Sequence, residues 1–314
     1  MGHKFDPTKS NSPGGVESIK LFPALRELRL DSLPSLEEWI EVDDDDIAGG
    51  GKVEIVFPCL EILKIDNCPR LEIWQIGGFS SHHKLSHLEI SKCYKLMAIP
   101  SMNGLSSLQL LRINKCFNIR SIPEECLRCL TALKELTFSN FDGVEAFPEG
   151  LRNLISLQRL HIFECSNLKH LFPLEALKSL IELTMGPFSS DLEEFPGLDC
   201  VIHLRASLKD LTLIGWDKIK FLPDQLQHLT ALKSLTLRKF NRVEVLPDWL
   251  GNLSSLQDLD IRECPNLKKR CIKYIEGKKY AGEEWSKISH ISKIWIDWEV
   301  IKRHEKLYIN VEDI

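Results

Sequence analysis

The sequence predicts an α/β solenoid, a curved horseshoe with a parallel β-sheet on its concave face and short helical or irregular returns on its convex side. An apolar triplet in the pattern L-x-x-L-x-L recurs at one phase, as at 232–237 and again at 256–261. Between the triplets an apolar residue stands at every third position up to a Leu-Pro pair, a period that no amphipathic helix has. These features are typical of the leucine-rich repeat, so the predicted fold class is an α/β leucine-rich-repeat solenoid.

The repeats can be counted from the first leucine of each triplet. Ten such leucines mark the chain: Leu25, Leu60, Leu85, Leu108, Leu133, Leu157, Leu180, Leu208, Leu232 and Leu256. Eight of the nine spacings are 23 to 28 residues, as this class requires. The remaining spacing, 35 residues, contains an acidic, glycine-rich loop insertion at 40–56. We therefore expect a polar leader at 1–20 that resembles a truncated inter-repeat loop, about ten repeats at 21–267, and a capping tail at 268–314.

Side chains of each predicted strand alternate between the core and the concave surface, where packing does not dictate their identity. Most outward positions are polar. Arginine and aromatic residues on such an open surface are favoured contact anchors. The candidate binding residues are Arg112, Arg159, His161, Phe163, Ile214, Arg238 and Arg262. The alternative for Phe163 and Ile214 is that isolated apolar residues on a surface need no function.

Ten cysteines could indicate a secreted disulfide framework, but their positions argue against it. Five of them follow the strand triplets at one fixed position: Cys68, Cys93, Cys116, Cys165 and Cys264. Other repeats place Leu, Phe or Trp in this column. A position shared by these residue types is buried and apolar, and free cysteine behaves there as a small hydrophobe. We expect buried, reduced thiols.

Composition restricts the partners and the compartment. The net charge of −5 gives no general attraction to nucleic acid, and no apolar run approaches the roughly 18 residues of a membrane span. The first 15 residues contain no apolar stretch suited to a signal peptide. The expected location is the cytoplasm, or the nucleus, without secretion.

The sequence contains no recognisable catalytic motif. H-E-x-x-H, G-x-S-x-G and the dinucleotide fingerprint are missing. The cluster Gly49–Lys52 lacks both the first glycine and the Ser or Thr of a phosphate-binding loop. Cys126 and Cys129 form the only C-x-x-C pair, without a second pair of metal ligands nearby. We expect no enzyme activity, no cofactor and no metal.

The segment after Leu267 loses the period and becomes basic, which is more typical of a solvated cap than of a phosphate site. Farther on it contains Trp285, Trp295 and Trp298. Aromatic side chains just beyond a last repeat are suited to covering its exposed core.

Two stretches, LQRLHIFECSNLKHLFP and LQDLDIRECPNLKKRC, combine the triplet with the cysteine column. They resemble the repeats of plant intracellular nucleotide-binding leucine-rich-repeat (NB-LRR) disease resistance receptors, especially the coiled-coil type. The ending is also similar: the family's Cys-Pro-x-Leu, Arg-Cys and Gly-Glu-Asp-Trp-x-Lys-Ile-x-His-Ile correspond to Cys264–Leu267, Arg270–Cys271 and Gly282–Ile291. The resemblance covers roughly residues 20 to 294, although Ser292 stands where the family often has proline.

The resemblance implies a protein-recognition module of a plant innate immune receptor, which senses a pathogen effector or a guarded host protein, or holds a switch domain inactive. The family's coiled-coil and nucleotide-binding domains have no counterpart in these 314 residues, so nucleotide binding is not expected of them. The expected partners are proteins, including those two domains of the same receptor. The alternative is a stand-alone adaptor or scaffold, such as a ubiquitin-ligase substrate receptor, although no F-box of about 40 residues fits before the repeats. An extracellular ectodomain would require an Asn column and G-x-I-P turns, which are missing.

Overall fold

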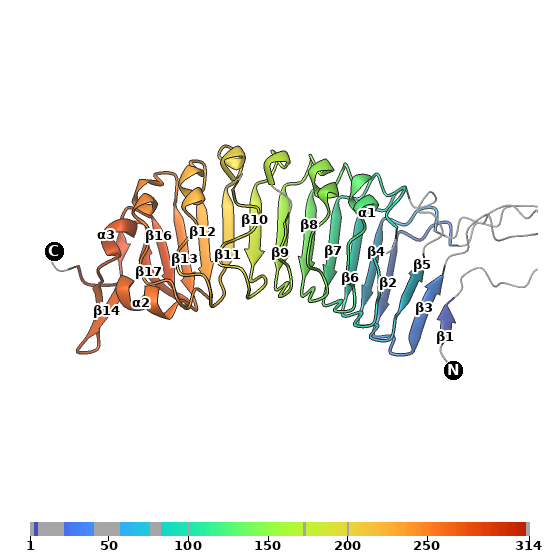
Figure 1. The fold of residues 1–314 in the computed structure, drawn as a ribbon, viewed down its shortest axis with the longest axis horizontal. Helices are drawn as coiled ribbons and strands as arrows, with labels where there is room; N and C mark the ends of the chain where they lie inside the picture. The colour runs from blue at the N-terminus through green and yellow to red at the C-terminus, as the bar shows by residue number, and fades with distance from the viewer. Residues whose placement is uncertain are drawn as a thin grey trace, which may run out of the picture. The chain divides into compact units, whose positions relative to one another are not determined.

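The computed structural model describes residues 3–5, 22–40, 57–75, 83–99, 101–171, 174–199 and 201–311. The chain forms two compact units, Met1–Leu157 and Gln158–Ile314, whose elements are labelled in Figure 1. The acidic insertion after Ile40 and most of the predicted leader lie outside the described residues, and so does the Gly49–Lys52 cluster.

The first unit contains a parallel sheet built from the first five predicted triplets. Its strands are β2 (Glu27–Asp31), β4 (Ile62–Asp66), β6 (His87–Ser91), β7 (Leu110–Asn114) and β8 (Glu135–Ser139). Each strand begins two residues after its marker leucine, and neighbours pair in register in the order in which the chain visits them. Parallel pairing of consecutive strands at one fixed register is what stacked repeats require.

The second unit repeats this arrangement with the other five triplets. Its parallel strands are β9 (Arg159–Phe163), β10 (Glu182–Gly186), β11 (Asp210–Ile214), β12 (Ser234–Arg238) and β13 (Asp258–Arg262). Neighbours again pair in register. The ten triplets therefore form the sheet strands of a leucine-rich-repeat solenoid, as the sequence predicts.

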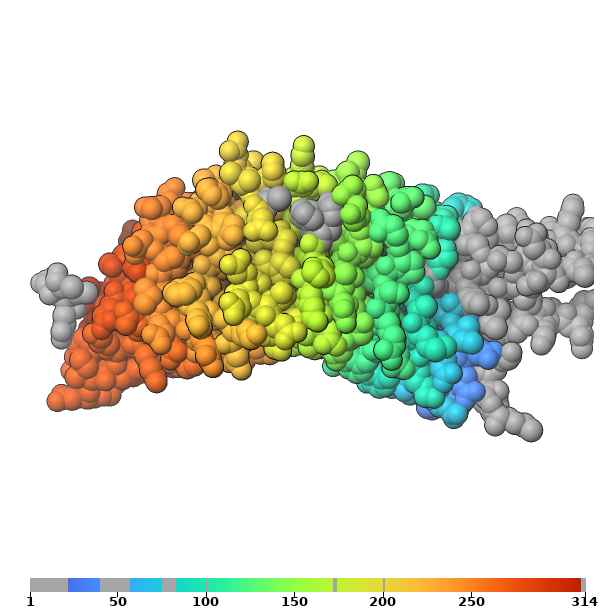
Figure 2. Space-filling model, viewed as in Figure 1, coloured from blue at the N-terminus to red at the C-terminus, as the bar shows by residue number. Residues whose placement is uncertain are grey.

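The core lies behind the sheet in continuous columns. In the second unit, Leu160, Leu183, Leu211, Leu235 and Leu259 occupy equivalent strand positions and are at most 1% exposed. Figure 2 shows the outside of the described part of the chain, where atoms of successive repeats are in contact on the face drawn. Since one repeat cannot bury its own apolar side, these columns hold each unit together.

The prediction of buried thiols is confirmed for all five cysteines of the column, which are free and at most 1% exposed. Each thiol donates a hydrogen bond to the carbonyl two residues earlier, with sulfur–oxygen distances of 3.1 to 3.6 Å. Cysteine thus fills an apolar position and also satisfies a carbonyl at the end of the strand.

Short helical turns form the returns of most repeats. In the first unit they are α1 (Glu124–Arg128) and η3 (Glu149–Asn153); in the second unit they are η4 (Leu174–Ala176), η5 (Val201–Leu204), η6 (Asp224–His228) and η7 (Asp248–Asn252). The prolines that precede α1, η3, η6 and η7 have φ between −59° and −70°. The fixed φ and missing N–H of proline end the extended segment, and the helical turn begins after it.

The first two returns differ from the expected helical or irregular form. Strands β3 (Leu36–Ile40) and β5 (Ile73–Gln75) pair in parallel, and β1 (His3–Phe5) pairs with β3. Trp39 and Trp74 are buried and stack with ring centroids 5.8 Å apart. These returns contain aromatic and branched residues, which favour strands, and no proline follows them as in the later repeats.

The segment after Leu267 extends the sheet of the second unit. It contains α2 (Pro265–Cys271), the hairpin of β14 (Ile272–Ile275) and β15 (Lys278–Ala281), and α3 (Trp285–Ile288). Then β16 (Lys293–Ile296) pairs in parallel with β13, and β17 (Glu299–Arg303) and β18 (Lys306–Leu307) follow antiparallel. The sequence analysis ended the repeats before this additional parallel strand. The role of 268–314 as a cap stays a prediction.

A buried carboxylate connects this segment to the preceding repeats. Glu284, 3% exposed, accepts a hydrogen bond from the backbone N–H of Leu246 at 3.0 Å. The same side chain forms ion pairs with Arg270 and Lys287, each at 3.1 Å. Lys287 in turn donates to the Leu246 carbonyl at 2.6 Å. A buried charge is tolerated when it is paired and hydrogen-bonded in this way.

Candidate protein-interaction surface

The solvent-facing side of the strands in the second unit, called here the sheet face, is sorted into three rows by the strand register. Each strand from β9 to β13 contributes three outward residues, and the register places equivalent residues beside one another. The first row contains Arg159, Glu182, Asp210, Ser234 and Asp258; the second contains His161, Thr184, Thr212, Thr236 and Asp260; the third contains Phe163, Gly186, Ile214, Arg238 and Arg262. Strand β16 adds Lys293 and Trp295 to the first two rows.

The first row is predominantly acidic. Partial burial raises the pKa of Asp210 above its usual 3.8, and the neighbouring charge of Asp258 raises it further, against the opposite effect of Lys233. The two carboxylates stand in one row on alternate strands and repel each other. A nearby cation therefore stabilises the ionised carboxylates of this row. The Lys293 ammonium forms such an ion pair with Asp258 at 3.1 Å.

Arg159, His161 and Phe163 lie together on β9, as predicted. Nδ1 of His161 lies 3.0 Å from Oγ1 of Thr184, and Nε2 lies 4.0 Å from the Glu182 carboxylate. The imidazole is only 17% exposed. These contacts hold the ring against residues of β10, and Phe163 follows at the end of β9, half-buried.

The prediction that Ile214 is exposed on this surface is wrong. Ile214 is 4% exposed. It is the last residue of β11 and stands in register with Arg238. The aliphatic stem of an arginine covers apolar surface beside it while its guanidinium stays in water. An outward strand position is therefore not a sufficient criterion for exposure.

Arg238 and Arg262 stand side by side in the third row and are held by carboxylates. Arg238 pairs with Glu263 at 3.3 Å, and Arg262 pairs with Asp260. Both guanidinium groups remain about one-third exposed. The buried Nε atoms of both arginines have no hydrogen-bond partner within the described residues. The exposed third of each side chain, held in place by its carboxylate, suits acceptor groups on a partner.

Trp298 lies beside Arg262 at this end of the sheet face. The sequence analysis assigned it to the capping tail and not to the candidate binding residues. It is 65% exposed, and the guanidinium carbon of Arg262 lies 4.1 Å from its ring centroid. It occupies the two-residue turn between β16 and β17 with φ of 72°, where a bulky side chain is disfavoured. The alternating stretches on either side of Asp297-Trp298 could have indicated a hairpin, but the exposure of the indole depends on the turn geometry.

Arg112 lies on β7 in the first unit, apart from this set of rows. Its Nε and Nη2 donate to Oε1 of Glu135 at 2.8 and 2.5 Å. The Glu135 side chain is 8% exposed, while Arg112 remains 45% exposed. A nearly buried carboxylate thus orients an accessible guanidinium.

The described residues include no group of three or more His, Cys, Asp or Glu side chains placed to hold a metal ion. The two cysteines of the C-x-x-C pair differ in exposure: Cys126 is buried and Cys129 is exposed. Among the helices in the described ranges, none has the length and apolar character needed to cross a bilayer.

Comparison with known proteins gives one family match. The family model described as R13L1/DRL21 LRRs matches residues 119–188, and the search of curated proteins gives no match. Among solved structures, the leucine-rich repeat domain of the type III effector XopL is 21% identical with a TM-score of 0.48, covering 78% of this chain and 71% of that one. The Leptospira interrogans LRR protein LIC12759 is 19% identical with a TM-score of 0.38, covering 81% and 84%.

The plant peptide hormone receptor RGFR1, in complex with RGF2, is 16% identical with a TM-score of 0.43. The match covers 87% of this chain and spans only 42% of that receptor. The strand register and the matched family model agree on one description. The chain is a leucine-rich-repeat solenoid, a typically non-enzymatic fold that serves as a protein-interaction module.

Proposed function

We propose that this chain is the protein-recognition module of a plant innate immune (disease resistance) receptor. The support is the match of residues 119–188 to R13L1/DRL21 repeats and the resemblance of 264–291 to the ending of NB-LRR receptors. On this proposal the partner is a pathogen effector, a guarded host protein, or a domain of the same receptor, and the site of action is the cytoplasm or nucleus.

The observation that carries the proposal is the composition of the sheet face in the second unit. An in-register parallel sheet requires only that outward residues be compatible with water, yet the three rows differ in chemistry. Thr184, Thr212 and Thr236 stand side by side between an acidic row and a row that ends in two arginines. Short hydroxyl side chains leave the centre of the face low and able to hydrogen-bond, with carboxylates on one side and Arg238 and Arg262 at one end of the other. This arrangement suits a protein surface better than a small enclosed ligand.

The third row supplies the residues from which the largest binding energy is expected. Arginine and tryptophan dominate measured interface energies because they combine a large contact area with directed hydrogen bonds. Arg238, Arg262 and Trp298 adjoin one another at one end of the face. Phe163 is half-buried at the other end of the same row.

Proximity labelling in leaf tissue tests this function. The full chain, fused to a labelling enzyme, is compared with the double variant Arg238→Glu, Arg262→Glu and with the matched control Lys178→Glu, Lys209→Glu, whose lysines lie on returns of the same unit. We expect a set of proteins whose labelling falls at least five-fold for the arginine variant only. Partners purified from that set should bind the wild-type chain in calorimetry and the arginine variant at least ten-fold more weakly, as two lost anchors imply.

The identities of those proteins decide between the two roles. Effectors, host proteins that effectors modify, or nucleotide-binding domains support the receptor role. A set dominated by ubiquitin-ligase subunits would instead support the adaptor alternative. Equal labelling by all three proteins would contradict recognition through the sheet face.

A further inference from the structure

A second surface lies on the returns of the second unit, away from the strand residues of the sheet face. Phe221, between β11 and η6, is 79% exposed. The same position in three other repeats, two residues before the proline, holds Ala146, Glu194 and Val245. These residues are exposed as well, so the repeat does not need an apolar side chain here. An aromatic ring exposed to this extent has no role in the core.

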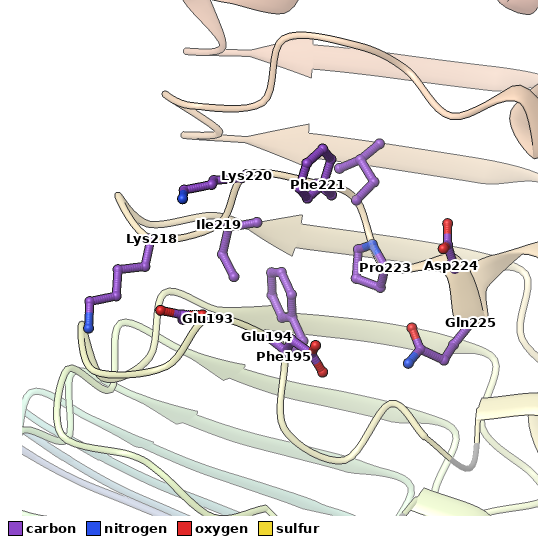
Figure 3. A pocket seen from close by; sticks show the side chains of 11 residues that line it. Glu193, Glu194, Phe195, Lys218, Ile219, Lys220, Phe221, Pro223, Asp224 and Gln225 are labelled. Atoms are coloured by element: carbon purple, nitrogen blue, oxygen red, sulfur yellow. The ribbon is translucent and has the colours of Figure 1, made fainter.

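Phe221 stands between two hollows. The first has a volume of about 460 Å³ and an apolar floor of Phe195, Ile219 and Leu222. Figure 3 shows Phe195 and Ile219 pointing into it, with Lys218 at one end and Asp224 and Gln225 at the other. The second hollow, about 360 Å³, lies on the other side of Phe221 and is lined by Arg242 and Val245. Val245 is itself 45% exposed.

The two hollows differ in net charge: the first is lined by three carboxylates, including Asp224, against Lys218 and Lys220, and the second is lined by two cations against one carboxylate. Glu193 and Glu194 line the first hollow on the preceding repeat. Lys220 lines both hollows, and Arg242 joins it in the second. Within the described residues none of these four side chains makes an ion pair, in contrast to Arg238 and Arg262 on the sheet face. The second hollow also contains the carboxylate of Glu244, so its two cations outnumber its one anion.

We propose that these two hollows form a docking site for an extended segment of a partner protein that contains a basic residue, an apolar anchor and an acidic residue, in that spatial order. The anchor packs against Phe221 over the apolar floor of the first hollow. The basic side chain meets Glu193 and Glu194, and the acidic side chain meets Lys220 and Arg242. Each contact then joins opposite charges that have no partner in the free protein, and the exposed ring of Phe221 is removed from water.

A random 12-residue peptide library displayed on phage, selected on the immobilised full chain, tests this site. We expect the enriched peptides to share a basic, an apolar and an acidic position. Synthetic fluorescent copies should lose at least ten-fold in affinity for Phe221→Ser. The matched control is Ile155→Ser, which removes another apolar residue that is 62% exposed and should leave binding unchanged. Thermal unfolding checks that both variants fold.

A charge exchange gives a readout that misfolding cannot produce. Lys220→Glu, Arg242→Glu should weaken the enriched peptides at least ten-fold, and replacing the acidic residue of the peptide with lysine should restore most of that loss. The site is overturned if no peptide is enriched, if enriched peptides lack the charge order, or if they bind Phe221→Ser as well as wild type. Peptides lost only in Arg238→Glu, Arg262→Glu would support the sheet face as the binding surface and also overturn this site.

Discussion

At the scale of single residues, the backbone adopts the same left-handed conformation at the junction between strand and return in several repeats. The residue just before the cysteine column has φ between 54° and 58° at Asn67, Lys92, Lys115, Asn140, Glu164, Lys239 and Glu263. This left-handed region is unfavourable for side chains other than glycine, asparagine and aspartate. The turn is nevertheless held because the next residue is buried and its strand is hydrogen-bonded into the sheet. The sequence indicates this conformation only at the two asparagines.

Lys115 allows a test of this strain. It is exposed, and its backbone N–H donates a hydrogen bond to the Ser139 carbonyl at 3.1 Å. Lys115→Gly should keep or slightly raise stability, whereas Lys115→Val should lower it by about 1–2 kcal/mol, since a branched side chain is disfavoured at positive φ. Both variants remove the same charge, so urea unfolding of the pair isolates the backbone effect. Equal stabilities would contradict it.

The thiols allow a second test. Burial is the main cause that raises the pKa of Cys68 and of Cys264 to about 11, and it raises the pKa of Cys271 to about 12. Because the thiolate is the reactive form, these groups should resist a maleimide at pH 8 while exposed Cys129 reacts within minutes. Mass spectrometry of labelled peptides, with a denatured sample as control, measures the order in which the cysteines react. Rapid native labelling of Cys264 would contradict the buried column.

At the scale of elements, β16 shows what a search for leucine triplets misses. Ile291, Ile294 and Ile296 repeat the triplet spacing with isoleucine, 35 residues after Leu256. The strand pairs in register with β13, as Leu259 with Ile294. The ordinary return is replaced here by α2, the hairpin and α3. The repeat spacing is therefore interrupted in the sequence, although the next strand still joins the sheet. Spacing alone could have identified the strand, but its partner depends on how that long connection folds.

The turn after β16 depends on an ion pair whose contribution varies with pH. Asp297 accepts the Glu263 N–H at 2.8 Å and pairs with Lys268 at 2.9 Å. Burial alone would raise the pKa of Asp297, but the hydrogen bonds from Lys268 and from the Glu263 N–H, together with the charge of Lys268, outweigh it, and the pKa falls below its usual 3.8. A lowered pKa in the folded state stabilises the protein above the unfolded value, and this stabilisation disappears as the pH falls through the lowered value.

Asp297→Asn should therefore cost about 1 kcal/mol at pH 7 and progressively less below pH 4. Chemical denaturation of both proteins at pH 7, 4 and 3 measures the difference. Asparagine tolerates the positive φ of 46° at this position, so the backbone should not contribute to the trend. A difference that is constant with pH would show that the charge of Asp297 does not stabilise the turn.

At the scale of the whole molecule, periodicity predicted the ten sheet strands because every repeat buries the same side in the same way. It could not predict departures that depend on one side chain or one connection. The strands β3 and β5 replace helical returns where Trp39 and Trp74 stack. Ile214 is covered although its position is outward, and the hollows beside Phe221 form between residues from different repeats.

The last prediction concerns the segment that follows the ten repeats. Stability of a solenoid is approximately a sum of repeat and interface terms, so an uncovered end repeat is costly. Five buried isoleucines lie in or near β16 and β17: Ile288, Ile291, Ile294, Ile296 and Ile301. Each contributes about 1.5–3 kcal/mol of burial, offset in part by the entropy of ordering the segment. Removing 268–314 would also leave the edge of β13 without its partner strand, open to pairing with another chain.

Truncation after Leu267 should therefore lower the unfolding temperature and cause concentration-dependent aggregation. Truncation after Arg303, which retains β16 and β17, should be far milder. Light scattering and calorimetry of the two shortened proteins beside the full chain make the comparison, and the matched truncation controls for the loss of a charged terminus. If the two behaved alike, residues 268–303 would not be protecting the last repeat, and the added parallel strand would have to be explained by its contribution to the sheet face, where it supplies Lys293 and Trp295.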